Sequence, residues 1–235
     1  MNPPMADTPQ ADSDEGAQSG LRSRKKARRR EVILDQARAL FAEKGVDATT
    51  MAEIAEAADV STPTVFNYFG HKDGILIAMI TEGAATARDH SKMLAPRTDD
   101  DFLTTLMALF MDISVETMAI ANKRIWRYAN AAMIRHPDNE FAKPFEEVDA
   151  ALLETVEKIL SQYALTLHDG SRADPGPVAH LFLDVWQATF QDFIRANEMT
   201  LEAHRDQLHA RFAPLCAMLF APDFVAAPTL AAKDA

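Results

Sequence analysis

The segment TTMAEIAEAADVSTPTVFNYFGHK, residues 49–72, contains the two helix starts that decide the fold. Thr50 and Glu53 have the T-x-x-E form of a capping box, in which each side chain binds a backbone N–H at the start of a helix. Ser61 can cap a second helix, and Pro63 falls in its first turn, where a missing N–H costs nothing. Two short helices joined by a tight turn are therefore expected.

A further helix is expected before this pair, beginning in a basic run and ending at Gly45. Its inner face repeats at helical spacing through Ile33, Leu34, Ala37, Leu40 and Phe41. The helix after Ser61 runs from Thr62 to Phe69 and should bury Val65 and Phe69, which lie four residues apart. Three helices with a tight turn between the last two form a helix-turn-helix, whose last helix enters the major groove of DNA.

The sequence from about residue 25 to about residue 90 resembles the DNA-binding domain of the tetracycline-repressor (TetR) family. The resemblance rests on Thr49-Thr50-Met51-Ala52-Glu53-Ile54-Ala55, on Val60-Ser61-Thr62-Pro63-Thr64-Val65-Phe66-Asn67-Tyr68-Phe69 and on Lys72. It implies a homodimeric bacterial transcription factor, usually a repressor. It also implies an N-terminal three-helix DNA-binding domain, followed by a C-terminal helical domain for ligand binding and dimerisation.

The resemblance further implies which side chains contact DNA. Base-edge or groove contacts are expected from Thr62, Pro63, Thr64 and Asn67. Phosphate contacts are expected from Thr50, Tyr68 and Lys72. The chemistry agrees, because an Asn amide can bond adenine in bidentate fashion, a Thr methyl or Pro ring can touch a thymine methyl, and hydroxyl and ammonium groups anchor the backbone.

Four positions depart from the common family pattern. Phe66 stands where a tyrosine is frequent, so a phosphate-binding hydroxyl is lost while a ring for sugar or thymine-methyl contact remains. Asp59 replaces the usual turn glycine, and Asp can adopt the left-handed conformation that such a turn requires. His71 and Gly74 make a weak start for the next helix, through which motion would pass between domains.

Charge is distributed unevenly along the chain. Its 235 residues include 24 Lys and Arg against 35 Asp and Glu, a formal net charge of −11. Residues 21–30 nevertheless hold seven cations, among them Arg28, Arg29 and Arg30, for which we expect DNA contacts. Such a run beside a small helical domain is typical of phosphate binding, because neutralised phosphates release counterions. A solvated tail is the alternative, and the helix-turn-helix that follows favours DNA contact.

Several classes of protein are disfavoured by composition. The eight glycines form none of the G-x-G-x-x-G, G-x-x-x-x-G-K or G-x-S-x-G motifs of nucleotide-binding folds and serine hydrolases. The single Cys216 allows no intrachain disulfide or multi-cysteine metal site and is interpreted as a small buried hydrophobe. No apolar run approaches the roughly 18 residues of a membrane-spanning helix, and the first 20 residues do not resemble an export signal. A cytoplasmic protein without membrane contact is expected.

Strand signals are scarce and helical spacing is nearly continuous, which predicts an all-α fold. A linking helix is expected from Lys72 to Leu94, and Pro96 ends it at a domain boundary. Four parts follow from this boundary and from the composition of the two ends. They are a disordered tail (1–20), a DNA-binding domain with basic arm and linking helix (21–95), a ligand-binding and dimerisation domain (96–221) and a flexible tail (222–235).

In the C-terminal domain, helical spacing recurs over residues 99–121, 148–163, 178–195 and 201–220. The family resemblance implies that the last two helices of each subunit form a four-helix bundle across the dimer axis. The predicted dimer contacts are Phe182, Phe190, Phe193 and Phe212. Phe190→Asp should then give monomers or unfolded protein.

Methionine and tryptophan gather in the segment where family members place an inducer pocket. Met107, Met111, Met118 and Met133 lie there with Trp126 and Tyr128. The predicted ligand-binding residues are Phe102, Met107, Phe110, Met111, Trp126, Met133 and Trp186. They indicate a small, largely apolar effector, with a cationic lipophile, a neutral molecule and an acyl chain all left open. Filling of the core is the alternative role for each side chain.

No constellation of side chains indicates catalysis, a metal site or a cofactor. His180 and Asp184 share a helix face but make only two ligands, and the chain has no H-E-x-x-H motif. Two classes of function remain: a ligand-responsive DNA-binding regulator, and an all-α small-molecule carrier or enzyme. The helix-turn-helix and its basic run favour a regulator, expected to be a repressor released by its effector from a pseudo-palindromic operator. An activator of the same fold is the alternative.

Overall fold

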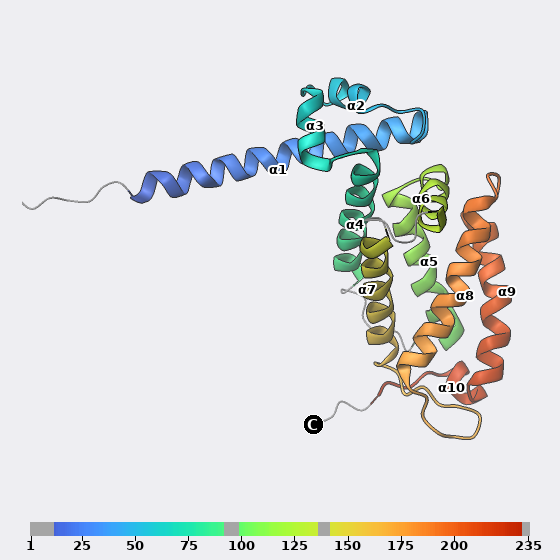
Figure 1. Ribbon diagram of the computed structural model, residues 1–235. Coiled ribbons are helices and arrows are strands. Elements are labelled where there is room, and N and C mark those ends of the chain that lie inside the picture. Colours follow the sequence, from blue (N-terminus) through green and yellow to red (C-terminus); the bar gives the residue numbers. More distant parts are fainter. Residues whose placement is uncertain (1–11, 92–98, 136–141, 232–235) are drawn as a thin grey trace, which may run out of the picture. The chain divides into compact units, whose positions relative to one another are not determined.

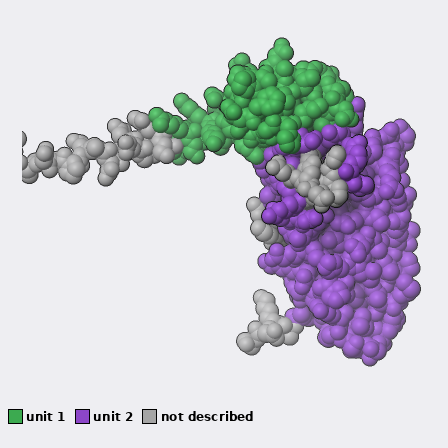
Figure 2. Space-filling view, viewed as in Figure 1, with its two compact units in different colours: residues 1–72 green, residues 73–235 purple. Residues whose placement is uncertain are grey.

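The computed structural model describes residues 12–91, 99–135 and 142–231, and these residues fold into ten α-helices (Figure 1). In this described part, extended pairing is confined to isolated bridges, so the predicted all-α fold is confirmed. The chain divides into two compact units, unit 1 (Met1–Lys72) and unit 2 (Asp73–Ala235), which Figure 2 shows in different colours. The predicted helix break at Pro96 lies outside the described residues.

Unit 1 consists of α1 (Asp12–Glu43), α2 (Met51–Ala57) and α3 (Thr62–Phe69). Its core is made by apolar side chains from all three helices, which are fully buried at Ile33, Ala37, Phe41, Ile54 and Val65. The bounds of α3 are those that the sequence predicts, because a cap residue and a glycine stand at its two ends. The predicted three-helix arrangement is confirmed.

α1 begins earlier than the sequence analysis predicts. The helix was expected to start in the basic run after a disordered tail of residues 1–20, but it starts at Asp12. Once the packed part of a helix has formed, each added residue gains one backbone hydrogen bond without a new nucleation cost. The composition of residues 12–20 therefore does not predict that α1 extends through them from its packed part. Residues 1–11 lie outside the described part of the chain.

Unit 2 contains six long helices and one short one, and α4 begins at the residue where unit 1 ends. The helices are α4 (Lys72–Ser91), α5 (Phe102–Ile120), α6 (Lys123–Arg135), α7 (Ala142–Leu160), α8 (Pro175–Arg195), α9 (Leu201–Leu219) and α10 (Pro222–Ala226). The unit boundary therefore lies before the linking helix, rather than after it at residue 95. Contacts explain this: the Tyr128 hydroxyl donates to Asp73 Oδ1 (3.3 Å), and Gly83 approaches Ile120 closely.

Side-chain caps fix the starts of three helices in unit 2. Asp101 accepts a hydrogen bond from the Thr104 backbone N–H (2.8 Å) at the start of α5. Asp174 and Thr200 cap α8 and α9 in the same way, at 3.1 Å in each case. Each cap satisfies a backbone donor that the helix itself leaves free, so these starts are determined locally by sequence.

Aromatic rings from α5, α8 and α9 form the core of unit 2. α8 and α9 lie side by side (Figure 1) and meet where the Phe182 and Phe212 rings pack edge to face, with centroids 4.9 Å apart. Phe110 of α5 completes this group at 5.0 Å from Phe212. Edge-to-face contacts add to the free energy of burying the rings, so these three helices are held together by one continuous cluster.

The end of the chain is folded, although a flexible tail was expected from Pro222. Phe224 of α10 is buried, and its ring centroid lies 4.8 Å from that of Phe102. Beyond α10, the Ala164 N–H donates to Thr229 O (2.8 Å) and the Ala231 N–H donates to Gln162 O (2.9 Å). Most residues around Phe224 are small or polar, so the composition of this segment predicts a flexible tail. It does not show that the ring of Phe224 is buried and holds the segment against the core.

α5 is long and apolar enough to cross a membrane by length and composition, which the sequence analysis did not recognise. Its apolar side chains have another use in this fold. Phe102, Leu106 and Phe110 are buried against the other helices of unit 2, and α5 packs along α9. These side chains belong to the core of unit 2, while Asp112 and Val115 stay exposed, so α5 has both a core face and an accessible face.

A buried polar cluster joins α5, α8 and α9. The Trp186 indole N–H donates to Ser114 Oγ (2.8 Å), and His204 Nε2 lies 3.0 Å from the same oxygen. His204 is fully buried and stacks on Phe193, and its Nδ1 has no hydrogen-bond partner in the described structure. Burial, with Lys123 as the second cause, lowers the pKa of His204 to about 4.

We expect His204 to make unit 2 less stable in acid. The pKa is depressed in the folded state, so the unfolded chain takes up the proton first, and stability falls as the pH drops from about 6.5 to about 4. The loss should reach about 2–3 kcal/mol. Urea unfolding followed by tryptophan fluorescence across this range measures it. His204→Gln, which keeps a donor without titrating, should flatten the curve, while His209→Gln on the exposed face of α9 should leave it unchanged. Parallel curves for the native protein and His204→Gln would contradict this assignment.

Candidate nucleic-acid interface and ligand cavity

The start of α2 has the predicted capping box. The Glu53 N–H donates to Thr50 Oγ1 (3.2 Å), and the Thr50 N–H donates to Glu53 Oε2 (2.8 Å). Lys44 donates to the other carboxylate oxygen at 2.7 Å. These hydrogen bonds, that from Lys44 first, lower the pKa of Glu53 to about 2. The Thr50 hydroxyl is thus engaged in the cap, and its contact with phosphate stays a prediction.

The turn between α2 and α3 is the predicted tight turn. Asp59 has φ 51°, the left-handed conformation that its place in the sequence implied. The Val60 N–H donates to Ala55 O (3.0 Å), which closes the end of α2. Ser61 occupies the N-cap of α3, but its hydroxyl pairs with the Thr64 hydroxyl at 2.8 Å rather than with a backbone N–H. The cap position was predicted correctly and its hydrogen bond was not.

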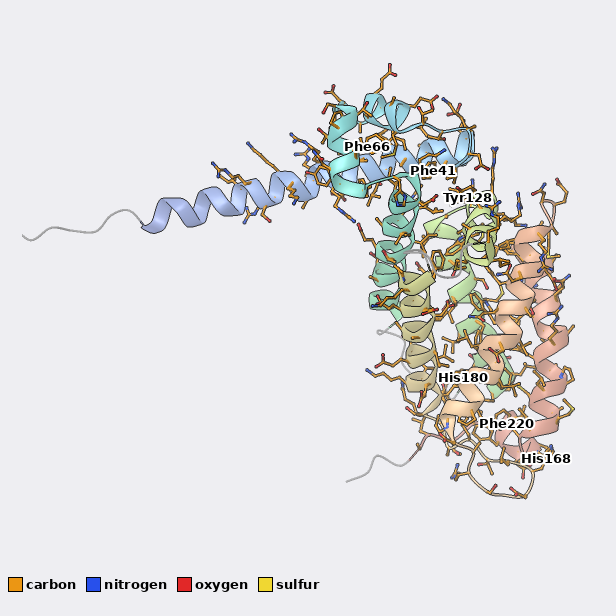
Figure 3. The ribbon with its side chains drawn as sticks, in the orientation of Figure 1. Phe41, Phe66, Tyr128, His168, His180 and Phe220 are labelled. Carbon is orange, nitrogen blue, oxygen red and sulfur yellow. The ribbon has the colours of Figure 1, made fainter. Side chains whose placement is uncertain are left out.

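α3 has a buried side and an exposed side. Val65 and Phe69 are buried, as predicted, so the helix is anchored on α1 and α2. Pro63, Phe66 and Asn67 are exposed, and their spacing of three and four residues puts them on one face. Figure 3 marks Phe66 on this helix and Phe41 on α1, and 48% of the Phe66 surface is accessible.

The residues around α3 that are predicted to contact the groove or the phosphates differ in their exposure and in their hydrogen bonds within the protein. Thr62 and Thr64 are half-buried at the edge of the exposed face. The Tyr68 hydroxyl donates to Lys26 O (3.3 Å), and the Lys72 ammonium donates to Val46 O (2.8 Å) and Asp47 O (3.0 Å). Tyr68 and Lys72 therefore have protein partners in this structure, and their phosphate contacts stay predictions.

The basic segment, residues 21–30, is part of α1 rather than a separate arm. Arg28 and Arg29 are exposed, together with Arg22, Arg24, Lys25 and Lys26. Arg30 is half-buried, with its guanidinium 5.1 Å from the centre of the Phe69 ring. Two contacts therefore hold the basic segment beside α3: this stacking and the bond from Tyr68 to Lys26.

Unit 2 contains a cavity of about 380 Å³ between α4, α5, α6, α7 and α8. Three of the predicted ligand residues, Trp126, Met133 and Trp186, line it. The rest of its wall is made by Ala84, Ala87, Leu109, Ile113, Glu116, Thr117, Ile120, Asn130, Phe145, Val148, Asp149, Leu152, Thr155, Asp184, Gln187, Ala188, Phe190 and Gln191. The volume is within the usual range for small-molecule sites, about 300–1,000 Å³.

The other four predicted ligand residues lie outside this wall. Phe102 packs against Tyr163, Phe220 and Phe224 at the far end of α5. Phe110 packs against Trp186 and Phe212 in the core, Met107 is buried, and Met111 is half-buried. Apolar side chains occur on every side of α5, so helical spacing did not distinguish its cavity face from its core faces.

Polar wall residues were missed by the sequence analysis. Asp149, Asp184 and Gln187 lie on helices whose polar side chains are normally solvated, so nothing in their spacing indicates a cavity. Asp149 remains accessible in the wall, and partial burial raises the pKa of its carboxyl group. His180, which was considered with Asp184 as a metal ligand, is exposed on α8 (Figure 3).

The linking helix α4 forms part of the cavity wall through Ala84 and Ala87. One residue earlier, Gly83 approaches α5 so closely that an added Cβ would lie 2.8 Å from Ile120 Cγ1. Ile120 itself lines the cavity. A molecule that displaces this side chain would therefore act directly on the packing of α4, the helix that follows α3 along the chain.

The four predicted dimer contacts are core residues of a single chain. Phe182, Phe190, Phe193 and Phe212 are each no more than 5% exposed. Phe190, for example, packs between Trp186 at 5.1 Å and Phe193 at 5.8 Å. A side chain enclosed by its own subunit offers no surface to a second copy, so any pairing through α8 and α9 must use their exposed faces.

The remaining chemical candidates are structural in character. Cys216 is buried, as expected, and desolvation, with a smaller contribution from Asp101, raises the pKa of its thiol to about 12. Within residues 12–91, 99–135 and 142–231, no three His, Cys, Asp or Glu side chains form a group able to hold a metal ion. The absence of a cofactor or of enzymatic activity stays a prediction.

Residues 33–79 match the family described as "Bacterial regulatory proteins, tetR family". This part of the chain is a TetR-family DNA-binding domain. The TetR-family match covers the last third of α1, all of α2 and α3, and the beginning of α4, which is the part of the chain where the helix-turn-helix geometry lies. The resemblance inferred from the sequence motifs is thereby confirmed.

Two relatives share this N-terminal part. The chain is 46% identical over 50 residues to the HTH-type transcriptional regulator YvkB of Bacillus subtilis, covering 21% of this chain and 26% of that protein. It is 35% identical over 81 residues to the HTH-type transcriptional regulator TcmR of Streptomyces glaucescens, covering 34% of this chain and 35% of that protein. The matched part thus spans only about a quarter to a third of the relatives' length.

The fold is shared over most of the chain. A TetR-family transcriptional regulator from Pectobacterium atrosepticum matches with a TM-score of 0.61 at 18% identity, covering 84% of this chain and 97% of that chain. At this identity the likeness establishes the common fold alone.

Proposed function

We propose that this protein is a sequence-specific DNA-binding regulator whose operator binding is controlled by a small molecule. The observation that carries the proposal is the surface of unit 1, where the exposed face of α3 lies beside a basic segment held to it by Tyr68 and Arg30. Asn67 and the threonines supply base-edge chemistry, and the cations supply phosphate contacts.

The charge distribution supports a nucleic-acid partner. The chain as a whole is acidic, with a formal net charge of −11, yet the basic segment and α3 carry no acidic residue. The remainder of the chain has an excess of acidic residues and repels DNA on average, so the charge distribution favours binding through this surface. Groove contacts from α3 then select the sequence.

Control by a ligand is supported by the cavity in unit 2. Its occupant would touch Ile120 and α4, and α4 continues along the chain from α3. An effector that turns a 99:1 operator-competent population into 1:99 must prefer one state by about 10⁴-fold, roughly 5.5 kcal/mol. Burial of apolar ligand surface in a cavity of this size can supply that difference.

We further propose a homodimer that uses the exposed faces of α8 and α9 and binds a pseudo-palindromic operator. Two α3 helices related by a two-fold axis would then read two half-sites. Repression follows when such a site overlaps a promoter, as the family resemblance implies for most members. An activator would bind in the same way at a site beside the promoter, and reporter expression with and without the protein distinguishes the two.

The proposal is tested by the sequence preference of Asn67→Ala. An operator is first selected from random duplexes with the native protein. The variant should lose about 1–3 kcal/mol at the base pair that Asn67 reads, with unchanged binding to random DNA, because a bidentate amide contact is specific to one base. Asn197→Ala, an exposed asparagine of unit 2, is the matched control. Equal losses on operator and random DNA would remove Asn67 as a base reader, and failure to select any sequence would overturn the regulator proposal.

A further inference from the structure

We infer that the cavity of unit 2 binds an organic cation with an apolar body, in preference to neutral or anionic molecules of the same size. This inference deepens the proposed function, because it names the chemical class of the effector. Binding itself can be measured without DNA, so the two proposals fail separately.

The described wall of the cavity contains acidic side chains and no basic ones. Glu116, Asp149 and Asp184 line the cavity, and its described wall contains no Lys, Arg or His. Asp149 and Asp184 make no hydrogen bond or ion pair with any described residue and remain accessible to an occupant. A monocation would supply the missing counter-charge, whereas an anion would meet three negative groups in a partly desolvated space.

Several hydrogen-bond donors of the wall already have acceptors within the protein. The Trp126 indole N–H donates to Thr117 O (2.9 Å), and that of Trp186 donates to Ser114 Oγ (2.8 Å). The Thr155 hydroxyl donates to Ala151 O (2.8 Å). These donors are already committed inside the protein. The wall's remaining side-chain donors, for example on Gln187 and Gln191, are neutral amides, so a carboxylate or phosphate in the cavity would find no charged donor of the kind that strengthens anion binding.

Aromatic rings form part of the cavity wall. Trp186 and Phe190 are stacked, with centroids 5.1 Å apart, and Trp126 meets Phe190 edge to face at 6.5 Å. Both indoles are held in place by the hydrogen bonds of their N–H groups, so their ring positions are fixed before a ligand arrives. The face of an indole ring attracts a cation more strongly than the face of a Phe or Tyr ring does. The attraction is stronger still when the cation and the ring are removed from water.

The ion itself must be organic rather than a metal. The described residues contain no group of three potential metal ligands, and the carboxylates share the wall with Leu109, Ile113 and Leu152. Apolar side chains cannot replace the hydration shell of a small inorganic ion. They can bury the alkyl or aryl groups of a quaternary or protonated amine. The acidic and the apolar parts of the wall therefore fit one molecule that has both a positive charge and an apolar body.

The test compares three probes with the same ten-carbon chain and different head groups: decyltrimethylammonium, decanol and decanoate, all below micellar concentration. The only two tryptophans of the chain, Trp126 and Trp186, both line the cavity, so their fluorescence reports binding. The cation should bind at least about tenfold more tightly than the alcohol, and the carboxylate most weakly. Decanol or decanoate binding as tightly as the cation would overturn the inference.

Variants then locate the charge effect. Asp149→Asn with Asp184→Asn should weaken decyltrimethylammonium about tenfold and leave decanol unchanged. Glu147→Gln with Glu154→Gln makes the same charge change at exposed positions of α7 outside the cavity wall and should alter neither. Equal effects of the two double variants would overturn the inference. Each single variant and a urea-unfolding curve show whether a loss arises from folding.

A measurement with operator DNA separates the two proposals. Cation binding that leaves the operator complex intact would contradict the effector role in the proposed function while the cavity's preference stands. Release of the operator by a neutral or anionic ligand, with no preference for the cation, would contradict the present inference alone.

Discussion

Replacing Lys25, Lys26, Arg28 and Arg29 by glutamine is expected to weaken operator binding on the order of 10³-fold at physiological salt. All four side chains are exposed on α1, and none forms an ion pair with another described residue. In the proposed dimer the change removes up to eight phosphate contacts, each of which contributes about 0.9 to the slope of log affinity against log salt concentration. A salt titration of operator binding by fluorescence anisotropy gives both quantities.

A matched variant separates this local effect from net charge. Replacing Arg124, Arg135, Lys143 and Lys158 of unit 2 by glutamine changes the charge equally at other exposed positions. Its affinity should fall far less, and its salt slope should equal that of the native protein. Similar losses in both variants would show that the basic segment is a solvated helix without phosphate contacts, the alternative that its sequence left open.

The helical form of the basic segment limits how many of its cations can act together. Residues 22–30 form more than two turns of α1, so their side chains point in several directions around the helix axis. The Tyr68 bond to Lys26 and the stacking of Arg30 on Phe69 fix which side of this helix is turned toward α3. We therefore expect Tyr68→Phe to reduce the affinity for operator DNA in two ways. It removes the hydrogen bond that orients the basic segment toward α3, and it removes any hydrogen bond from the Tyr68 hydroxyl to a phosphate.

Unit 1 could be predicted closely because its signals are local. The capping box at Thr50, the left-handed Asp59 and the ends of α3 each depend on side chains within a few residues of one another. Such local signals do not depend on how the remainder of the chain packs. The early start of α1 was missed because it depends on a folded neighbour rather than on the composition of the tail.

In unit 2 the helices were predictable and the roles of their apolar side chains were not. Helical spacing shows that Phe190 is buried but not whether a second subunit or its own chain buries it. The structure places it among Trp126, Trp186 and Phe193 of the same chain. Phe190→Asp is therefore expected to unfold unit 2 rather than to separate intact monomers. Likewise, the carboxylates of the cavity gave no signal, because a polar residue on a helix is ordinarily solvated.

Truncating the ring of Phe224 is expected to be as damaging as a substitution in the centre of the bundle. Phe224→Ala should destabilise unit 2 by about 3–5 kcal/mol, since it removes a buried ring and leaves a cavity beside its neighbours. Those neighbours are Phe102 at 4.8 Å and Phe220 at 5.7 Å, both fully buried. Urea unfolding followed by the two tryptophans, which both belong to unit 2, measures the loss.

Ile134→Ala is the control, because this apolar side chain of α6 is 82% exposed and should matter little. The composition after Pro222 predicts that Phe224→Ala will be equally harmless, whereas the packing of α10 predicts a loss of several kcal/mol. If the two variants unfold at the same urea concentration, the end of the chain is the flexible tail that its composition indicates. If Phe224→Ala alone is destabilised, α10 closes the core of unit 2 beneath α5, and residues to 231 belong to the folded domain.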